Sequence, residues 1–353
     1  MRETLNQAKL AMLFRKEFEL CAVKRGETLV LLSDLGARRD YVAAAFAAAE
    51  DLGADIYEMC VNVTPSWTKV GVATVGRSKG TLEAIKAADM LVCLHIPLFT
   101  RWLQEVRDAG TRVLMIIDSP DELEELMAPP GLKEAVVHAG NRLQQAKSMR
   151  ITRPGGTDLS VALGEYPTMI QYGFAESAGR FDHWGAGHVH TFPNEGTANG
   201  SVVLRAGDIV ILPYCRYVQD EVRLDIRDGF IRKIEGGFDA ALMNDWLEGN
   251  RAHPSDMDGH AISHLGWGLN PQGRWDAIAL VGDDPTRHHA GARCFAGNFL
   301  FSTGPNSQGG GKRTTKGHYD VPMRDCTVSL DNDLVIERGR FTDEKMRVAK
   351  VQR

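Results

Sequence analysis

The chain has 353 residues, of which 43% are hydrophobic and 25% are charged, with a formal net charge of -5 at pH 7. These values are ordinary for a globular protein of roughly two domains. The acidic balance argues against nucleic acid or an anionic membrane as a partner, and no apolar run reaches the roughly 20 residues that span a bilayer.

Strand and helix signals alternate through residues 1–150. Short apolar runs predict buried parallel strands, and longer alanine-rich or amphipathic runs predict helices. The expected order is strand 28–32, helix 41–52, strand 55–63, helix 81–88, strand 90–95, helix 100–109 and strand 113–117. Ser119, Pro120 and Glu122 then predict the capped start of another helix. This rhythm is typical of an open α/β domain with a parallel sheet.

The texture of the sequence changes after Arg153-Pro154-Gly155-Gly156. Short runs rich in β-branched residues now alternate with Gly and Asp turns, which predicts strands. The expected elements are strands 201–204, 208–212, 221–226, 230–234, 277–281, 295–302 and 326–330, with one helix at 240–249. We therefore predict two domains, an α/β domain over 1–150 and a β-rich α+β domain over 151–353, and the candidate catalytic and metal-binding residues given below lie in the second.

The cysteines and the N-terminal residues indicate in which cellular compartment the protein is expected. The six cysteines form no Cys-x-x-Cys motif, so we expect reduced thiols rather than a disulfide framework. Charges interrupt the first residues where a signal peptide would need an apolar core. We expect a cytoplasmic protein.

Nine of the eleven histidines follow residue 150, and two of them accompany a carboxylate in a metal-binding pattern. The chain has His264 in His-Leu-Gly-Trp-Gly-Leu-Asn-Pro, and His318 and Asp320 in His-Tyr-Asp. Two imidazoles and one carboxylate can hold a divalent iron on one face and leave the other face open for dioxygen and substrate. A His-x-Asp pair in a polar loop can also be solvated, so the pattern alone leaves both interpretations open.

A second cluster consists of His188, His190 and Glu195. Residues i and i+2 of a strand point to one face, so the two imidazoles could bind together. The spacing resembles the first cupin motif, but the flanking glycines differ and a jelly roll does not fit the α/β first half. We favour a hydrogen-bonding or acid/base role for one histidine and a solvent-facing position for the other.

The second half resembles the metallo-aminopeptidases of the aminopeptidase T type. The similar stretches are Gly156–Leu159, Leu265–Pro271, Gly291–Gly297 and His318–Asp320. That family uses a two-metal site built from two Glu, two His, a Tyr and an Asp. Here His264 stands where the family has Glu, and Cys294 where it has His. Without the bridging carboxylates, the resemblance implies ligands for one metal only.

Over its whole length the chain resembles more closely the family of 2,5-dihydroxypyridine 5,6-dioxygenases, the ring-opening enzymes of bacterial nicotinate and nicotine catabolism. The resemblance implies mononuclear Fe(II) held by His264, His318 and Asp320, with no organic cofactor. It implies cleavage of 2,5-dihydroxypyridine by O2 to N-formylmaleamic acid.

The same resemblance implies four pocket residues. His188 and Glu176 would be catalytic, with His188 as the acid/base group, and Arg293 and Ser302 would bind substrate. We expect a small aromatic N-heterocycle and O2 as partners, no nucleic acid or membrane, and a homo-oligomer. Two alternatives remain open, a two-metal aminopeptidase or other metallohydrolase on this scaffold, and a non-catalytic small-ligand binding protein.

Overall fold

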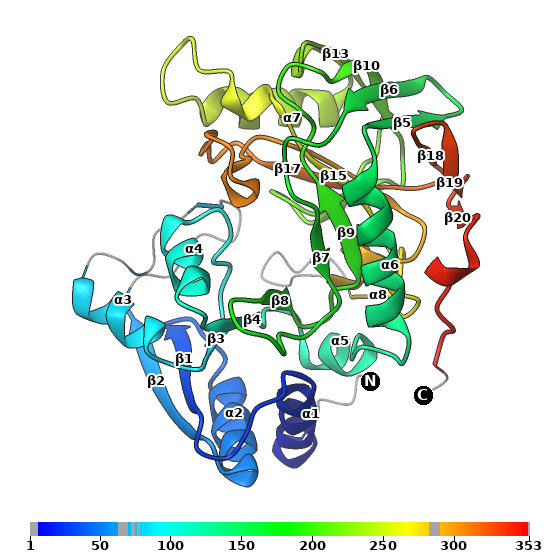
Figure 1. Ribbon diagram of the computed structural model, residues 1–353. Coiled ribbons are helices and arrows are strands. Elements are labelled where there is room, and N and C mark those ends of the chain that lie inside the picture. The colour runs from blue at the N-terminus through cyan, green and yellow to red at the C-terminus, as the bar shows by residue number, and fades with distance from the viewer. Residues whose placement is uncertain (1–5, 63–69, 72–74, 76–77, 282–289, 352–353) are drawn as a thin grey trace. The chain divides into compact units, whose positions relative to one another are not determined.

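The computed structural model describes residues 6–62, 70–71, 75, 78–281 and 290–351, which form two compact units (Figure 1). Among these residues, the first unit comprises the chain up to Ala128 together with Gln171–Ala186. The second unit comprises Pro129–Ile170 and the described chain from Gly187 onward. The predicted boundary near residue 150 falls in the second unit and stays a prediction about separately folding domains.

The first unit is built on a five-stranded parallel sheet with the strand order β2-β1-β3-β4-β8. Its strands are β1 Thr28–Asp34, β2 Asp55–Val61, β3 Met90–Cys93, β4 Arg112–Met115 and β8 Phe181–His183. The predicted parallel sheet is confirmed. The fifth strand, β8, comes from beyond residue 150, and nothing in the local sequence predicted that pairing.

Helices pack on both faces of this sheet, because β1 is apolar at every position from Leu29 to Leu32. Leu29 and Leu31 lie in one core with helices α1 and α2, whereas Val30 and Leu32 lie in another with α3 and α4. The helices are α1 Gln7–Leu20, α2 Arg39–Leu52, α3 Lys79–Lys86, α4 Arg101–Asp108 and α5 Pro120–Glu125. As predicted, α2 ends at Gly53, which has the left-handed conformation (φ 73°).

Helix α1 buries a carboxylic acid, Glu17, completely. Its Oε2 atom has no hydrogen-bond partner among the described residues. Burial, and secondarily the charge of Asp182, raises the pKa of Glu17 well above its ordinary value.

This raised pKa predicts a pH-dependent stability. Above the unfolded-state pKa of about 4.3 the unfolded chain releases a proton that folded Glu17 keeps. The contribution of Glu17 to the free energy of unfolding is therefore most favourable at low pH, and it is lost as the pH rises through the folded-state pKa. Glu17→Gln should flatten this dependence, measured as urea midpoints at pH 5 and pH 8. Glu19→Gln, exposed on the same helix, is the control, and equal slopes in wild type and Glu17→Gln would contradict the expectation.

The second unit is dominated by antiparallel sheets. An eight-stranded sheet has the order β14-β13-β10-β6-β5-β18-β19-β20, a five-stranded sheet has the order β17-β16-β15-β9-β7, and β11 pairs with β12. The strands are β5 Ser148–Arg153, β6 Thr157–Ala162, β7 Met169–Gln171, β9 His188–Thr191, β10 Asn199–Leu204, β11 Ile209–Val210, β12 Arg216–Tyr217, β13 Val222–Arg227, β14 Phe230–Gly236, β15 Ile262–Gly268, β16 Phe299–Thr303, β17 Tyr319–Met323, β18 Thr327–Leu330, β19 Asp333–Glu337 and β20 Arg340–Phe341. The predicted fold class, a parallel α/β part followed by a β-rich α+β part, is confirmed.

The helices of the second unit include one correction. They are α6 Leu132–Gln145, α7 Phe238–Gly249, α8 Ala277–Val281 and α9 Ala290–Cys294, with 3₁₀ turns at Asp258–His260, Ser307–Gly309 and Glu344–Met346. The prediction of a strand over 277–281 was wrong, because this segment is α8. A short apolar run does not distinguish a strand from a helical turn by its periodicity. Helix α7 follows the prediction for 240–249.

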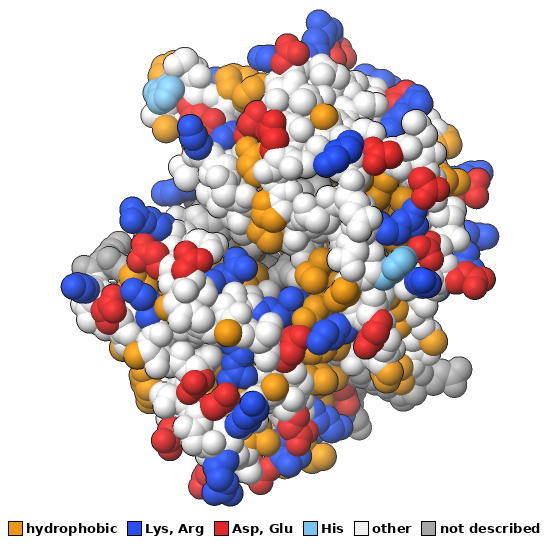
Figure 2. Space-filling view, in the orientation of Figure 1, with side chains coloured by type: hydrophobic (Ala, Val, Ile, Leu, Met, Phe, Trp, Pro, Cys, Tyr) orange, Lys and Arg blue, Asp and Glu red, His pale blue; other side chains and the backbone are white. Residues whose placement is uncertain are grey.

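The surface shows no broad region of one charge on the face drawn in Figure 2, where acidic and basic side chains are interspersed. Within the described part of the chain, none of the helices has both the length and the apolar character needed to cross a membrane.

Candidate metal centre

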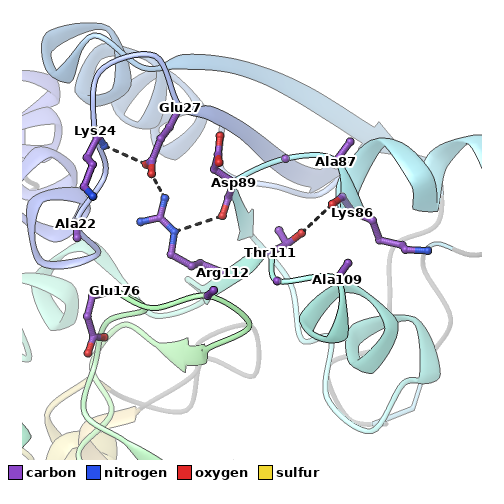
Figure 3. A pocket seen from close by; sticks show the side chains of 13 residues that line it. Ala22, Lys24, Glu27, Lys86, Ala87, Asp89, Ala109, Thr111, Arg112 and Glu176 are labelled. Carbon is purple, nitrogen blue, oxygen red and sulfur yellow. Dashed lines mark hydrogen bonds and ion pairs between the residues drawn. The ribbon is translucent and has the colours of Figure 1, made fainter.

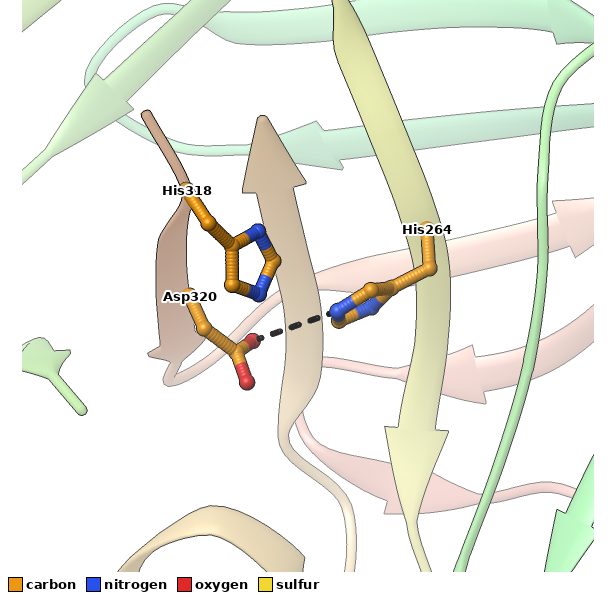
Figure 4. Close-up of side chains that lie close together, drawn as sticks. All are labelled: His264, His318 and Asp320. Atoms are coloured by element: carbon orange, nitrogen blue, oxygen red, sulfur yellow. Dashed lines mark ion pairs between the residues drawn. The ribbon is translucent and has the colours of Figure 1, made fainter. Parts of the chain in front are cut away.

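The five-stranded antiparallel sheet of the second unit brings the three predicted metal ligands together (Figure 4). His264 lies on β15, Asp320 lies on β17, and His318 directly precedes β17. His318 and Asp320 are two residues apart in extended chain, so their side chains leave the same face. One donor atom from each residue lies within 4.8 Å of the other two, and all three side chains are buried.

Strand β16 lies between β15 and β17, and two of its residues hydrogen-bond to the two histidines. The ring of His318 donates from Nδ1 to the carbonyl oxygen of Thr303 at 2.7 Å, since a carbonyl can only accept. With this proton on Nδ1, Nε2 is the ring nitrogen that carries the lone pair, and it is the nitrogen with which His318 would bind a metal. The hydroxyl of Ser302 donates to the carbonyl oxygen of His264 at 2.8 Å and holds the backbone of β15 in place.

Asp320 is engaged through only one of its carboxylate oxygens. Oδ2 accepts a hydrogen bond from Nε of Arg293 at 2.7 Å. Oδ1 has no hydrogen-bond partner among the described residues and lies 4.0 Å from Nε2 of His264. A buried carboxylate oxygen without a partner is costly, and a cation shared with the two imidazoles would remove that cost. The donor set therefore fits a single divalent metal of the two-histidine, one-carboxylate type.

The protonation state of the two histidines also suits a metal. Burial lowers the pKa of His264 well below its ordinary value, and the neighbouring His318 and Arg293 lower it further. Burial also lowers the pKa of His318, against the opposing influence of Asp320 and the bond to Thr303. Both rings are accordingly neutral near pH 7, which is the form that binds a metal ion.

Arg293, on α9, connects the carboxylate ligand to His188. Its Nη1 lies 2.7 Å from Nε2 of His188. A guanidinium only donates, so Nε2 of His188 is the acceptor in this bond. The structure thus places Arg293 beside Asp320, His188 beside Arg293, and Ser302 against the backbone of His264. Their roles in catalysis and substrate binding stay predictions.

Strand β9 carries both histidines of the rival cluster, and both are buried, His188 at 1% and His190 at 3% exposure. The prediction that one of them faces solvent was wrong, because every residue of β9 is covered. His190 and His188 lie opposite Gly266 and Gly268 of β15 in the sheet register. Gly266 allows the two strands to approach closely, since a Cβ there would lie 1.9 Å from the carbonyl oxygen of Val189.

A cupin-like set does not form around His188 and His190. Glu195 instead pairs with Arg313 and accepts from the hydroxyl of Tyr166 at 2.9 Å and from Nδ2 of Asn306 at 2.6 Å. Within the described residues, His264, His318 and Asp320 form the only group of three potential ligands. Thr303, which the sequence did not single out, orients His318 through its backbone carbonyl, and no side-chain pattern signals such a role.

Glu176, predicted to be catalytic, belongs to the first unit. Its carboxylate accepts from the hydroxyl of Tyr172 at 2.6 Å and pairs with Arg180 at 3.5 Å. Its role stays a prediction.

Glu176 also lines a pocket of about 430 Å³ in the first unit (Figure 3). This pocket lies where β1, β3 and β4 begin, whereas open α/β sheets usually bind ligands where their strands end. Its Arg112 is held by Glu27 at 2.5 Å and by the carbonyl oxygen of Asp89 at 3.3 Å. We assign no function to the pocket.

Fold and site together define a mixed α/β protein with a buried candidate site for one metal ion. Comparison with known proteins identifies the family within this class. The family model described as 2,5-dihydroxypyridine 5,6-dioxygenase matches residues 9–343. A protein of Pseudomonas putida named 2,5-dihydroxypyridine 5,6-dioxygenase is 35% identical over 343 residues, covering 95% of this chain and 96% of that protein. The chain belongs to the 2,5-dihydroxypyridine 5,6-dioxygenase family.

Two solved structures are similar to the chain. The 2,5-dihydroxypyridine dioxygenase of Pseudomonas putida KT2440 superposes with a TM-score of 0.92 at 34% identity, covering 97% of this chain and 100% of that one. AmpT from Thermus thermophilus superposes with a TM-score of 0.63 at 12% identity, covering 95% of this chain and 99% of that one. The second likeness shows a shared fold only.

Proposed function

We propose that this protein is a dioxygenase that opens the ring of 2,5-dihydroxypyridine with O2 at a mononuclear Fe(II) centre. Both oxygen atoms would enter the product, N-formylmaleamic acid, in nicotinate or nicotine catabolism. The observation that carries the proposal is the buried cluster of His264, His318 and Asp320 in a chain of this family. Two imidazoles and one carboxylate leave positions open on the metal for both reactants.

The proposed ligands and neighbours have separate tasks. His264, His318 and Asp320 would hold Fe(II), which supplies the electronic link between an electron-rich ring and dioxygen. Arg293 keeps the Asp320 carboxylate oriented and offers cationic N–H groups to the oxygens of the substrate. Ser302 already donates its hydroxyl proton to His264, so its oxygen would serve as an acceptor.

The proposed acid/base residue, His188, needs one rearrangement before it can act. Its Nε2 lone pair already accepts from Arg293. For this nitrogen to take the proton of a substrate hydroxyl, Arg293 must turn toward the substrate and release it. We propose that substrate binding makes this exchange. Glu176 is proposed as a second catalytic residue on the family resemblance alone.

The first alternative, a two-metal aminopeptidase, is disfavoured by the composition of the site. His264 replaces the carboxylate that would bridge two ions, and the described residues supply a single group of three ligands. The second alternative, a binding protein without chemistry, gives no account of a buried carboxylate oxygen that lacks a partner beside two neutral imidazoles. We also propose a cytoplasmic homo-oligomer, on composition and family resemblance.

Anaerobic reconstitution tests the proposed function. The purified chain is titrated with Fe(II), 2,5-dihydroxypyridine is added, and oxygenated buffer is then mixed in while the aromatic absorbance is followed. We expect one iron per chain and loss of absorbance with one O2 consumed per ring. Two zinc or cobalt ions per chain with peptide hydrolysis would support the aminopeptidase, and iron loading without any ring loss would contradict the proposal.

A further inference from the structure

His190 is a buried imidazole beside the metal cluster that the proposed chemistry does not yet use. Its ring centroid lies 4.9 Å from that of His264, and it stacks on His188 at 5.5 Å with 17° between the planes. The ring of Phe192 approaches it edge-on at 6.2 Å. The side chain is 3% exposed. His190 therefore belongs to the wall of the site rather than to the surface.

Neither ring nitrogen of His190 has a hydrogen-bond partner among the described residues. An imidazole carries at least one N–H in either protonation state. A buried N–H without an acceptor costs free energy, because the water it bonded in the unfolded chain is not replaced. The packing against His188, His264 and Phe192 would be served as well by a phenylalanine ring. The nitrogens thus carry a cost that packing does not explain.

A fourth metal ligand is not the explanation. The donor atoms that lie within 4.8 Å of one another come from His264, His318 and Asp320, and His190 is not among them. A protein acceptor is not supplied from across the sheet either, since the residue opposite His190 is Gly266, which has no side chain. What remains is an acceptor that arrives with the substrate.

We propose that His190 is a substrate-binding residue that donates its N–H to an oxygen of the aromatic N-heterocycle. The inference deepens the proposed function and rests on it. Arg293 and His190 would then engage the substrate as two separate donors, one cationic and one from an imidazole. A site that is built to donate such a bond discriminates against ring analogues that lack the matching oxygen. His190 would therefore contribute to choosing a hydroxylated ring.

The test replaces His190 by phenylalanine and measures three quantities under anaerobic conditions. These are the Fe(II) affinity, the affinity of the iron-loaded protein for 2,5-dihydroxypyridine from its absorbance change, and the thermal midpoint without substrate. For His190→Phe we expect Fe(II) affinity within about twofold of wild type and an equal or higher thermal midpoint. Substrate affinity should fall roughly tenfold, as for one lost hydrogen bond in a dry site. His190→Gln, which keeps an N–H donor, should lose less.

Two outcomes would overturn the inference. Unchanged substrate affinity in His190→Phe would mean that the nitrogens serve no ligand, and a large fall in Fe(II) affinity would mean that His190 binds the metal. His260→Phe is the matched control, a buried histidine of the same unit that pairs with Glu248 at 3.2 Å and should leave substrate affinity unchanged. If His190→Phe does not fold, His190→Leu, which also removes both ring nitrogens, is measured in its place with the same expected fall in substrate affinity. Absence of substrate binding in wild type would instead contradict the proposed function.

Discussion

Replacing His318 by alanine is expected to abolish ring opening and to weaken Fe(II) binding by more than about 100-fold, since even the partners behind metal ligands are typically worth about 10- to 100-fold. His318 is oriented by the bond from its Nδ1 to the carbonyl oxygen of Thr303. Its loss leaves one imidazole and one carboxylate, which do not define a three-point face for the ion. Anaerobic Fe(II) titration followed by oxygen addition measures both quantities.

The control for this prediction is His253→Ala. His253 lies in the same unit but is exposed and bonds to the hydroxyl of Ser255 at 3.0 Å, so iron binding and turnover should stay at wild-type values. Folding of His318→Ala is checked by its circular dichroism. Wild-type turnover in a folded His318→Ala protein would remove His318 from the metal site and, with it, the assignment of the cluster as the iron centre.

Replacing Asp208 by asparagine is expected to cause the largest loss of stability, about 3–5 kcal/mol in the free energy of unfolding, the usual cost of leaving one partner of a buried ion pair alone. Asp208 is 2% exposed and accepts two hydrogen bonds from Arg153, each of 2.8 Å. It also accepts from the backbone N–H groups of Arg205 and Arg324 at 2.8 and 3.1 Å. Asparagine keeps the shape but leaves the guanidinium of Arg153 buried without a countercharge.

Strands β5 and β6 of the eight-stranded sheet supply a matched control. Arg150 and Asp158 form an equivalent two-bond pair, at 2.9 Å for each bond, but both side chains are more than half exposed. Water and salt screen such a pair, so Asp158→Asn should barely move the urea midpoint. The comparison is made by urea unfolding of both variants and wild type at one pH. Equal small shifts in both variants would show that burial of the Arg153–Asp208 pair carries no special penalty.

Local patterns predicted the parallel sheet well. The continuous apolar runs that became β1, β3 and β4 are characteristic of strands buried on both faces, and Gly53 ended α2 where expected. Patterns failed where the partner is distant. Strand β8 joins β4 from some 65 residues along the chain, and the five-residue run at 277–281 became helix α8. A short apolar segment is compatible with either structure until its neighbours are in place.

In the candidate site, too, local sequence patterns predicted some features and missed others. His318 and Asp320 could be paired from the sequence, since two residues apart in extended chain share a face. His264 was a candidate ligand on its residue type, and the resemblance to known families supported its place beside them. The burial of both histidines of β9 was missed. A polar residue of a strand is expected to face water only where one face of the sheet is solvated, and every residue of β9 is covered.

The sequence by itself determined the order and type of most elements, the fold class and the identity of the three candidate ligands, because periodicity and residue chemistry are local properties. Tertiary structure alone decided what surrounds them. The pairing of β15, β16 and β17 sets the ligand distances, directs Thr303 and Ser302 onto the histidines, and leaves His190 opposite a glycine. Strand pairing joins segments tens of residues apart, so their register and burial depend on the whole sheet rather than on any stretch of sequence.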